Sequence, residues 1–151
     1  MVSQRPDIKL TPEEQARFLA ESKRCALATL DKDGYPHVVA MNYVAKDGAI
    51  WMTSYGKAQK VLNIRRNPKV CVMIESGRNY AELQGLMWRG RCEIIDEPSA
   101  VQQTMRAMAG SVAAASSVPS GASSSAPKRV VLKVTPEKIA SWDHRKLGGR
   151  Y

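Results

Sequence analysis

The chain has 151 residues, and its 23 Lys and Arg residues outnumber 14 Asp and Glu residues, which gives a formal net charge of +9. This length fits one domain that buries its own core, so we predict a single domain over residues 1–151. No apolar run approaches the roughly 18 residues that a membrane-spanning helix needs, and Met1–Leu10 lacks the pattern of a secretory signal. The three cysteines lie in apolar, strand-like runs, which predicts buried thiols in a reducing compartment and hence a cytoplasmic protein.

The first half of the sequence predicts one helix followed by three antiparallel strands. Thr11 suits a helix cap, Pro12 suits the first turn, and two glutamates follow, so a helix is expected to run to about Lys23. The two Asp-Gly turns of this half, at residues 31–34 and 46–48, are typical of hairpins. The strands beside these turns are expected at Cys25–Leu30, Tyr35–Ala45 and Ala49–Ser54.

The second half predicts further strands between two helices. A short helix over residues 58–66 is expected to stop at Asn67-Pro68. The later elements are expected as a strand at Lys69–Glu75, a long strand or bent pair at Ala81–Ile95, a helix at Ser99–Met108, a low-complexity loop at Gly110–Pro127, a strand at Arg129–Thr135, a turn or short helix from Thr135, and a basic tail at Ser141–Tyr151. Short strands joined by hairpins favour a small antiparallel barrel, so we predict a mainly β, α+β fold with about six strands.

The segment from Trp51 to Pro68 indicates a phosphate site. A predicted strand ends in two hydroxyl side chains, Thr53 and Ser54, and a glycine then leads to Lys57 and Lys60 at the start of a helix. Backbone N–H groups at a helix start bind anions, whereas the helix dipole disfavours a lysine there by about 0.3–1 kcal/mol. A bound anion removes this conflict, although solvated lysines on a helix surface would give the same pattern.

Four segments of the sequence resemble the flavin/deazaflavin oxidoreductase superfamily, the pyridoxamine-phosphate-oxidase-like split β-barrels. They are C-A-L-A-T-L-D-K-D-G-Y-P-H at 25–37, K-x-x-K-x-x-N-I-R-R-N-P at 57–68, G-x-x-E-I-I at 90–95, and S-W-D-H-R-K-L-G at 141–148. The first two segments are typical of the whole superfamily. The last resembles an actinobacterial branch that is associated with the deazaflavin coenzyme F-420.

This resemblance implies a six-stranded split barrel that forms a homodimer with two cofactors at the interface. The cofactor phosphate would bind at the segment just described, the deazaflavin ring would lie against the second strand, and the oligoglutamate tail would follow a basic surface. The residues that we expect to contact the cofactor are His37, Val38, Val39, Ala40, Thr53, Ser54, Lys57, Lys60, Arg89, Arg91, Trp142, His144, Arg145 and Lys146.

The function implied is an oxidoreductase that transfers a hydride from reduced coenzyme F-420 to an unidentified small-molecule acceptor. The cofactor supplies the hydride chemistry, and the protein supplies binding, orientation and a dry site, so no catalytic triad is required. His37 and Tyr43 are the candidates for a proton donor. Neither a metal site nor a membrane contact is expected.

Three alternatives stay open at this point. An FMN-binding oxidoreductase of the same family would use the same phosphate site, because both cofactors have a phosphate on a ribityl chain. A non-catalytic protein that binds a cofactor, haem or lipid on the same barrel would show binding without turnover. A nucleic-acid-binding barrel is disfavoured, because few aromatic residues are interleaved with the basic ones.

Overall fold

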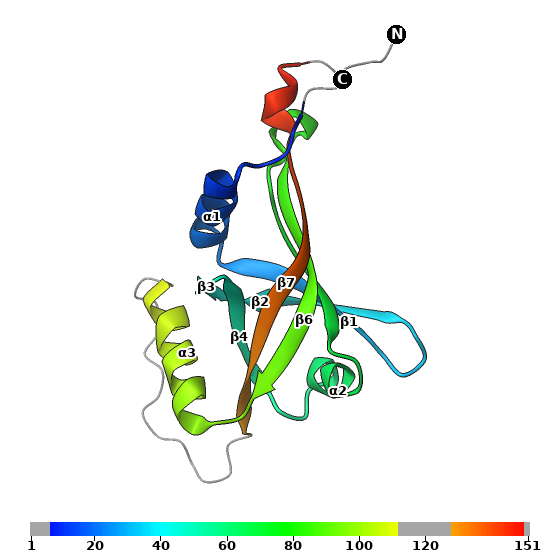
Figure 1. The fold of residues 1–151 in the computed structure, drawn as a ribbon, viewed down its shortest axis with the longest axis vertical. Coiled ribbons are helices and arrows are strands. Elements are labelled where there is room, and N and C mark those ends of the chain that lie inside the picture. Colours follow the sequence, from blue (N-terminus) through cyan, green and yellow to red (C-terminus); the bar gives the residue numbers. More distant parts are fainter. Residues whose placement is uncertain (1–6, 112–127, 150–151) are drawn as a thin grey trace.

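The computed structural model describes residues 7–111 and 128–149, and a curled antiparallel sheet lies at its centre (Figure 1). Within these residues, seven strands pair in the order β2-β1-β5-β6-β7-β4-β3. The strands are β1 Arg24–Leu30, β2 Pro36–Asn42, β3 Val44–Lys46, β4 Ala49–Tyr55, β5 Lys69–Ser76, β6 Gln84–Ile95 and β7 Arg129–Asp143. The helices are α1 Pro12–Glu21, α2 Gln59–Arg66 and α3 Pro98–Ser111, with short 3-10 helices η1 Tyr80–Glu82 and η2 His144–Leu147.

The sheet has seven strands and not six, because the predicted strand Tyr35–Ala45 is divided in two. Residues 36–42 pair with β1 at one edge of the sheet, and residues 44–46 pair with β4 at the other edge. Tyr43 lies between them with 2% of its surface exposed, and its backbone N–H donates to the carbonyl of Lys23 at 3.1 Å. The curl of the sheet brings its two edges close enough for one continuous segment to join both.

The last strand is also longer than the sequence predicted. A turn or short helix was expected from Thr135, yet β7 continues through Pro136 to Asp143. A bulge makes this possible, because the pairing with β6 shifts between Arg89 and Gly90 and leaves Glu137 without an opposite residue. Gly90 is required at this bulge, since a Cβ there would collide with the carbonyl oxygen of Thr135.

Two local predictions are confirmed by hydrogen bonds. Thr11 and Glu14 form a capping box at the start of α1: the Thr11 hydroxyl accepts from the Glu14 N–H at 3.2 Å, and the Glu14 carboxylate accepts from the Thr11 N–H at 2.7 Å. In the hairpin between β1 and β2, the Asp31 carboxylate accepts the N–H groups of Asp33 and Tyr35, each at 2.9 Å. Polar side chains therefore fix both the start of α1 and the hairpin turn between β1 and β2.

Helix α3 packs on β3, β4 and β7, which places it over one face of the sheet (Figure 1). It extends to Ser111, beyond the predicted end at Met108, so Gly110 belongs to the helix and not to the predicted loop. The rest of that loop, residues 112–127, lies outside the described residues.

The core lies on the inner face of the curled sheet and includes Leu27, Ile50, Met52, Val72 and Leu132, each at most 1% exposed. Cys25 and Cys92 are buried free thiols, and burial raises the pKa of each to about 12. The prediction of buried cysteines is wrong for Cys71, which is half-buried. Among the described helices, none has the length and apolar character to cross a membrane.

Candidate cofactor site

The start of α2 has backbone N–H groups without a side-chain cap. Ala58 occupies the cap position, no side chain bonds there, and the first turn contains no acidic residue. Two lysines lie there instead: Lys57 is exposed and Lys60 is half-buried. A helix start that is positively charged and uncapped fits an anion, because the free N–H groups and the helix dipole both favour negative charge.

The two hydroxyl residues of the predicted phosphate site point to opposite faces of β4. Ser54 is 5% exposed, and its hydroxyl donates to the Tyr55 carbonyl at 3.3 Å. Thr53 lies on the other face, opposite Val131 of β7, and is half-buried. Consecutive strand residues face opposite sides of a sheet, so the structure does not bring these two hydroxyls together.

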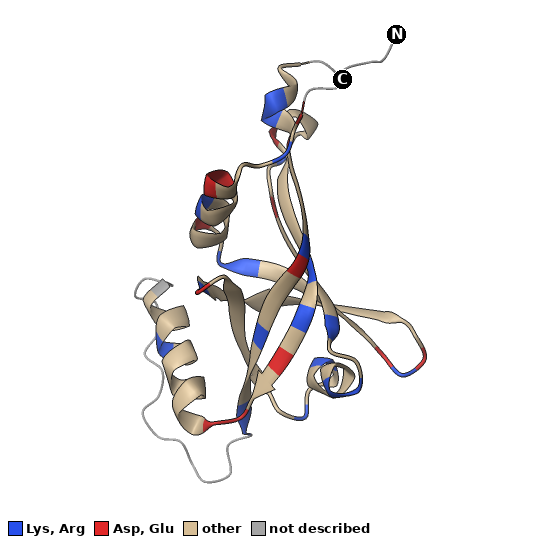
Figure 2. Ribbon diagram, in the orientation of Figure 1, with Lys and Arg blue, Asp and Glu red and all other residues tan. Residues whose placement is uncertain are grey.

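A basic hollow of about 780 Å³ opens beside Lys57. Its cationic residues are Lys57, Arg65, Lys128 and Arg129, and its acidic residue is Asp96. Figure 2 shows Lys and Arg at both α2 and the start of β7, the elements that meet here. Arg129 also lies over the Tyr55 ring, 4.4 Å from its centroid, with an N–H that donates to the Tyr55 hydroxyl at 3.2 Å.

The contribution of Arg65, Lys128 and Arg129 was not predicted from the sequence. Arg65 lies in the last turn of α2, where the helix dipole alone accounts for a cation, and the other two lie more than 60 positions further along the chain. They reach Lys57 only because β7 pairs with β4, so that Arg129 lies opposite Tyr55. That pairing joins distant segments, and no local motif indicates it.

A buried polar network attaches α2 to β1. Asn63 has no exposed surface, and its Nδ2 donates to the Thr29 hydroxyl at 3.0 Å. Its Oδ1 accepts from Gln59 Nε2 at 2.8 Å and from the Arg66 guanidinium at 3.3 Å. The same guanidinium donates to the Leu30 carbonyl at 3.0 Å. The sequence analysis did not identify this network.

The predicted ring-binding residues alternate along β2. His37 and Val39 face the interior and are half-buried, whereas Val38 and Ala40 are exposed on the outer face. His37 lies opposite Thr29 of β1, and its Nδ1 is buried without a hydrogen-bond partner among the described residues. A buried ring nitrogen without a partner is uncommon, and His37 stays a candidate for contact with a ligand or a bound water.

Tyr43, the second candidate for a proton donor, is part of the core. Its hydroxyl donates to the Leu19 carbonyl of α1 at 2.7 Å, and burial is the main cause that raises its pKa well above the ordinary value. A phenol that is buried, hydrogen-bonded and hard to ionise has no open route to a substrate. We therefore do not retain Tyr43 as a proton donor.

Arg89 and Arg91 lie exposed on the outer face of β6. Arg91 forms an ion pair with Glu137 at 2.7 Å, in which both side chains are more than half exposed. Arg89 borders a second hollow of about 360 Å³, whose floor includes Ala28 and Cys71. Neither arginine borders the basic hollow beside Lys57.

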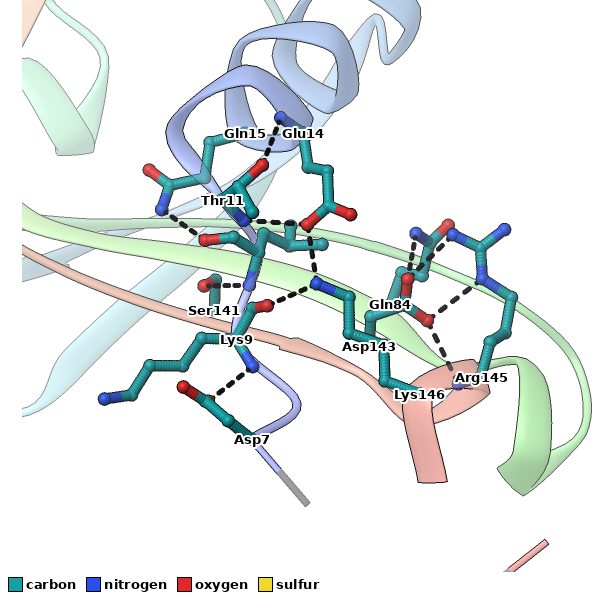
Figure 3. A network of polar contacts seen from close by, with 11 residues as sticks. Asp7, Lys9, Thr11, Glu14, Gln15, Gln84, Ser141, Asp143, Arg145 and Lys146 are labelled. Carbon is teal, nitrogen blue, oxygen red and sulfur yellow. Dashed lines mark hydrogen bonds and ion pairs between the residues drawn. The ribbon is translucent and has the colours of Figure 1, made fainter. Parts of the chain in front are cut away.

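The motif at the end of β7 forms a network within the chain (Figure 3). Asp143 is 3% exposed and accepts two bonds from the Arg145 guanidinium, at 2.9 and 2.8 Å, which lowers the pKa of its carboxyl. Lys146 donates to the Glu14 carboxylate at 2.7 Å, which lowers the pKa of Glu14, and to the Lys9 carbonyl at 2.6 Å. The segment before α1 is thus fastened to the end of β7.

The remaining residues of this motif also have partners in the chain. The His144 ring lies 4.5 Å from the Tyr80 ring, and its Nδ1 is 2.8 Å from the Tyr80 carbonyl oxygen. Trp142 packs over Gly85, where a Cβ would collide with the indole. Within one chain, η2 and α2 lie at opposite ends of the sheet (Figure 1), so the motif and the basic hollow are not brought together.

Comparisons with known proteins identify the family. Residues 11–143, most of the chain, match the sequence pattern described as pyridoxamine 5'-phosphate oxidase. The chain belongs to the pyridoxamine 5'-phosphate oxidase family. This confirms the resemblance to the pyridoxamine-phosphate-oxidase-like superfamily, and the mainly β, α+β architecture is the one that the family implies. No curated protein matches the chain.

Solved structures of similar fold belong to proteins that are described with different functions. The conserved hypothetical protein Rv2991 of Mycobacterium tuberculosis is 33% identical with a TM-score of 0.82, over 99% of this chain and 95% of that one. A protein described as an F420 reductase is 26% identical with a TM-score of 0.70, over 86% and 98%. HutZ, the haem storage protein of Vibrio cholerae, is 19% identical with a TM-score of 0.66, over 89% and 96%, and shares the fold alone. The shared fold therefore does not by itself distinguish a reductase from a binding protein.

Proposed function

We propose that this protein is a coenzyme F-420-dependent oxidoreductase that transfers a hydride to a small-molecule acceptor. The observation that supports this most is the basic hollow beside the uncapped start of α2, with Lys57, Arg65, Lys128 and Arg129 around it. Coenzyme F-420 has both a phosphate and an anionic tail, so it offers negative charge to the helix start and to the hollow. The similarity to an F420 reductase at 26% identity supports the same assignment.

In this proposal the residues of the chain bind and orient the cofactor. The N–H groups at the start of α2, together with Lys57 and Lys60, hold the phosphate, and the other cations of the hollow attract the tail. The ring lies on the side of β2 that His37 and Val39 face, and His37 is the remaining candidate for a proton donor. Bound coenzyme F-420 would supply the hydride at its deazaflavin ring.

We also propose that the protein is a homodimer through the outer face of β2, β1, β5 and β6. Strand pairing places Ala40, Ala26, Met73 and Met87 in one row across this face. Met73 is 39% exposed and Val38, on the same face, is 60% exposed. A row of apolar side chains left open to water on a sheet face is typical of an interface. Because the motif at the end of β7 does not reach the basic hollow within one chain, we propose that it contacts the cofactor of the second copy.

A double variant tests the dimer. We expect Val38→Lys with Met73→Lys to sediment as a monomer, because two cations would be buried in an apolar interface. Leu62→Lys is the matched control, since Leu62 is 46% exposed but lies on α2. A wild-type chain that sediments as a monomer would overturn the dimer.

The first test of function is a parallel titration of the purified protein with coenzyme F-420 and with FMN at moderate salt, followed by fluorescence. We expect micromolar or tighter binding of coenzyme F-420 and much weaker binding of FMN, because FMN has no anionic tail for the hollow. Stronger binding of FMN would assign the protein to the alternative cofactor. Binding of neither would overturn the phosphate site.

A further inference from the structure

Helix α2 cannot set its own position accurately. It has eight residues and begins at Gln59 without a side-chain cap, and so short a helix is marginal in isolation. Its apolar anchors are Val61 and Ile64, at 0% and 2% exposure. Apolar packing of two side chains resists detachment of the helix but opposes small rotations only weakly, because dispersion contacts are not directional.

Asn63 adds directional bonds to this packing. A polar side chain with no exposed surface is costly to bury unless its hydrogen bonds are made, and both of its polar atoms have partners. Nδ2 donates to Thr29 on β1, and Oδ1 accepts from Gln59 in the first turn of α2. One side chain therefore links the first turn of the helix to the neighbouring strand.

The partners of Asn63 lie beside the two halves of the proposed cofactor site. Gln59 lies next to Lys60 at the phosphate end. Thr29 lies opposite His37, the residue of β2 beside the proposed ring position. The bond between Thr29 and Asn63 thus joins α2 to β1, the strand that pairs directly with the ring-facing strand β2.

We propose that Asn63 is a positioning residue, which acts through α2 to hold the anion-binding helix start in register with the ring-binding strand. This inference rests on the proposed function. Asn63 itself touches no cofactor in this view, because it has no exposed surface. Replacing Asn63 should therefore reduce the affinity that the phosphate group adds to cofactor binding.

The test compares two ligands, coenzyme F-420 and its phosphate-free deazaflavin chromophore, by fluorescence titration. The dissociation constant of the chromophore divided by that of coenzyme F-420 measures the affinity that the phosphate and the tail add. The variant is Thr29→Val with Asn63→Leu, which replaces both partners by apolar groups of similar size and so avoids a buried unpaired hydroxyl. We expect the ratio to fall about ten-fold while affinity for the chromophore stays unchanged, since a net hydrogen bond is worth up to about that factor.

Two further variants make the result decisive. Thr104→Val is the matched control: Thr104 is a second buried threonine, 6% exposed, whose hydroxyl donates to the Ala100 carbonyl within α3. It should leave the ratio at the wild-type value. Gln59→Ala changes an exposed side chain, retains the fold, and should lower the ratio about three-fold through loss of one hydrogen bond. If the double variant does not fold, Gln59→Ala decides the test.

The outcomes separate the two proposals. A wild-type ratio near one would mean that no phosphate site exists, and it would overturn the proposed function together with this role of Asn63. A large wild-type ratio that persists in the double variant, or in Gln59→Ala when that variant decides, would overturn the positioning role alone. A fall of equal size in Thr104→Val would also overturn it, because the effect would then follow from general destabilisation.

Discussion

Replacing Lys57 and Lys60 by alanine should weaken cofactor binding and stabilise the free protein at the same time. In the structure, Lys57 is exposed and Lys60 half-buried, so each contact with a phosphate is expected to contribute about 1 kcal/mol, between the values for surface and buried charged bonds. Together they give about 2 kcal/mol, or a roughly 30-fold weaker dissociation constant.

The stability of the free protein should change in the opposite direction. Both lysines lie at the positive end of the α2 dipole, where each costs about 0.3–1 kcal/mol. Their removal, worth about 0.6–2 kcal/mol together, is expected to raise the melting temperature by roughly 2–5 °C in the absence of ligand. A residue that served the fold would show the reverse, so the two measurements together identify a binding role.

The assay is a fluorescence titration with coenzyme F-420 at ~0.15 M salt, combined with thermal melts without ligand. Lys23→Ala with Lys32→Ala is the control, because both are exposed and their removal changes the net charge equally. At this salt the screening length is about 8 Å, so distant charges should matter little. Affinity within about two-fold of wild type, or an equal loss in the control, would refute the reasoning.

Three other predictions concern the described fold. Gly90→Ala should lower the free energy of unfolding by about 2–3 kcal/mol, since its Cβ would meet a backbone carbonyl. The control Gly110→Ala, in open space near the end of α3, should not destabilise the protein. Chemical denaturation measures both variants. The pKa values of Asp143 and Glu14 are lowered in the folded state, so the stability that these carboxylates contribute is present at neutral pH and is lost as the pH falls below the ordinary values of 3.8 and 4.5. Asp143→Asn should reduce the loss of unfolding free energy at acid pH, and an unchanged loss would contradict the assignment. Tyr43→Phe should cost about 1 kcal/mol of stability and leave hydride transfer unchanged, and a selective loss of turnover would restore Tyr43 as a proton donor.

Local chemistry explains which elements were predictable. The helix cap at Thr11 and the hairpin turn at residues 31–34 form as predicted, because the hydrogen bonds that fix them join residues within four positions of each other. Most strand positions also followed from short apolar runs between turn residues. The errors lie where tertiary contacts override local preference. Pro136 suggested a break, but a bulge opposite Gly90 allows the strand to continue.

The candidate site was only partly predictable for the same reason. Lys57 and Lys60 precede or begin one helix, so their proximity follows from the sequence alone. Arg129 joins them through strand pairing across the sheet. Asn63 is part of the motif at residues 57–68, but that motif does not show that its side chain meets Thr29 of a strand 34 positions earlier.

The position of β7 in the sheet has a consequence for folding during synthesis. It is the last strand along the sequence, yet it lies between β6 and β4. Until β7 leaves the ribosome, β2-β1-β5-β6 and β4-β3 are two separate sheets, each with an unpaired edge. We expect the nascent chain to expose these edges until synthesis is nearly complete and to depend on chaperones in that interval. A chain that terminates before Arg129 would leave two half-sheets with no strand paired between them.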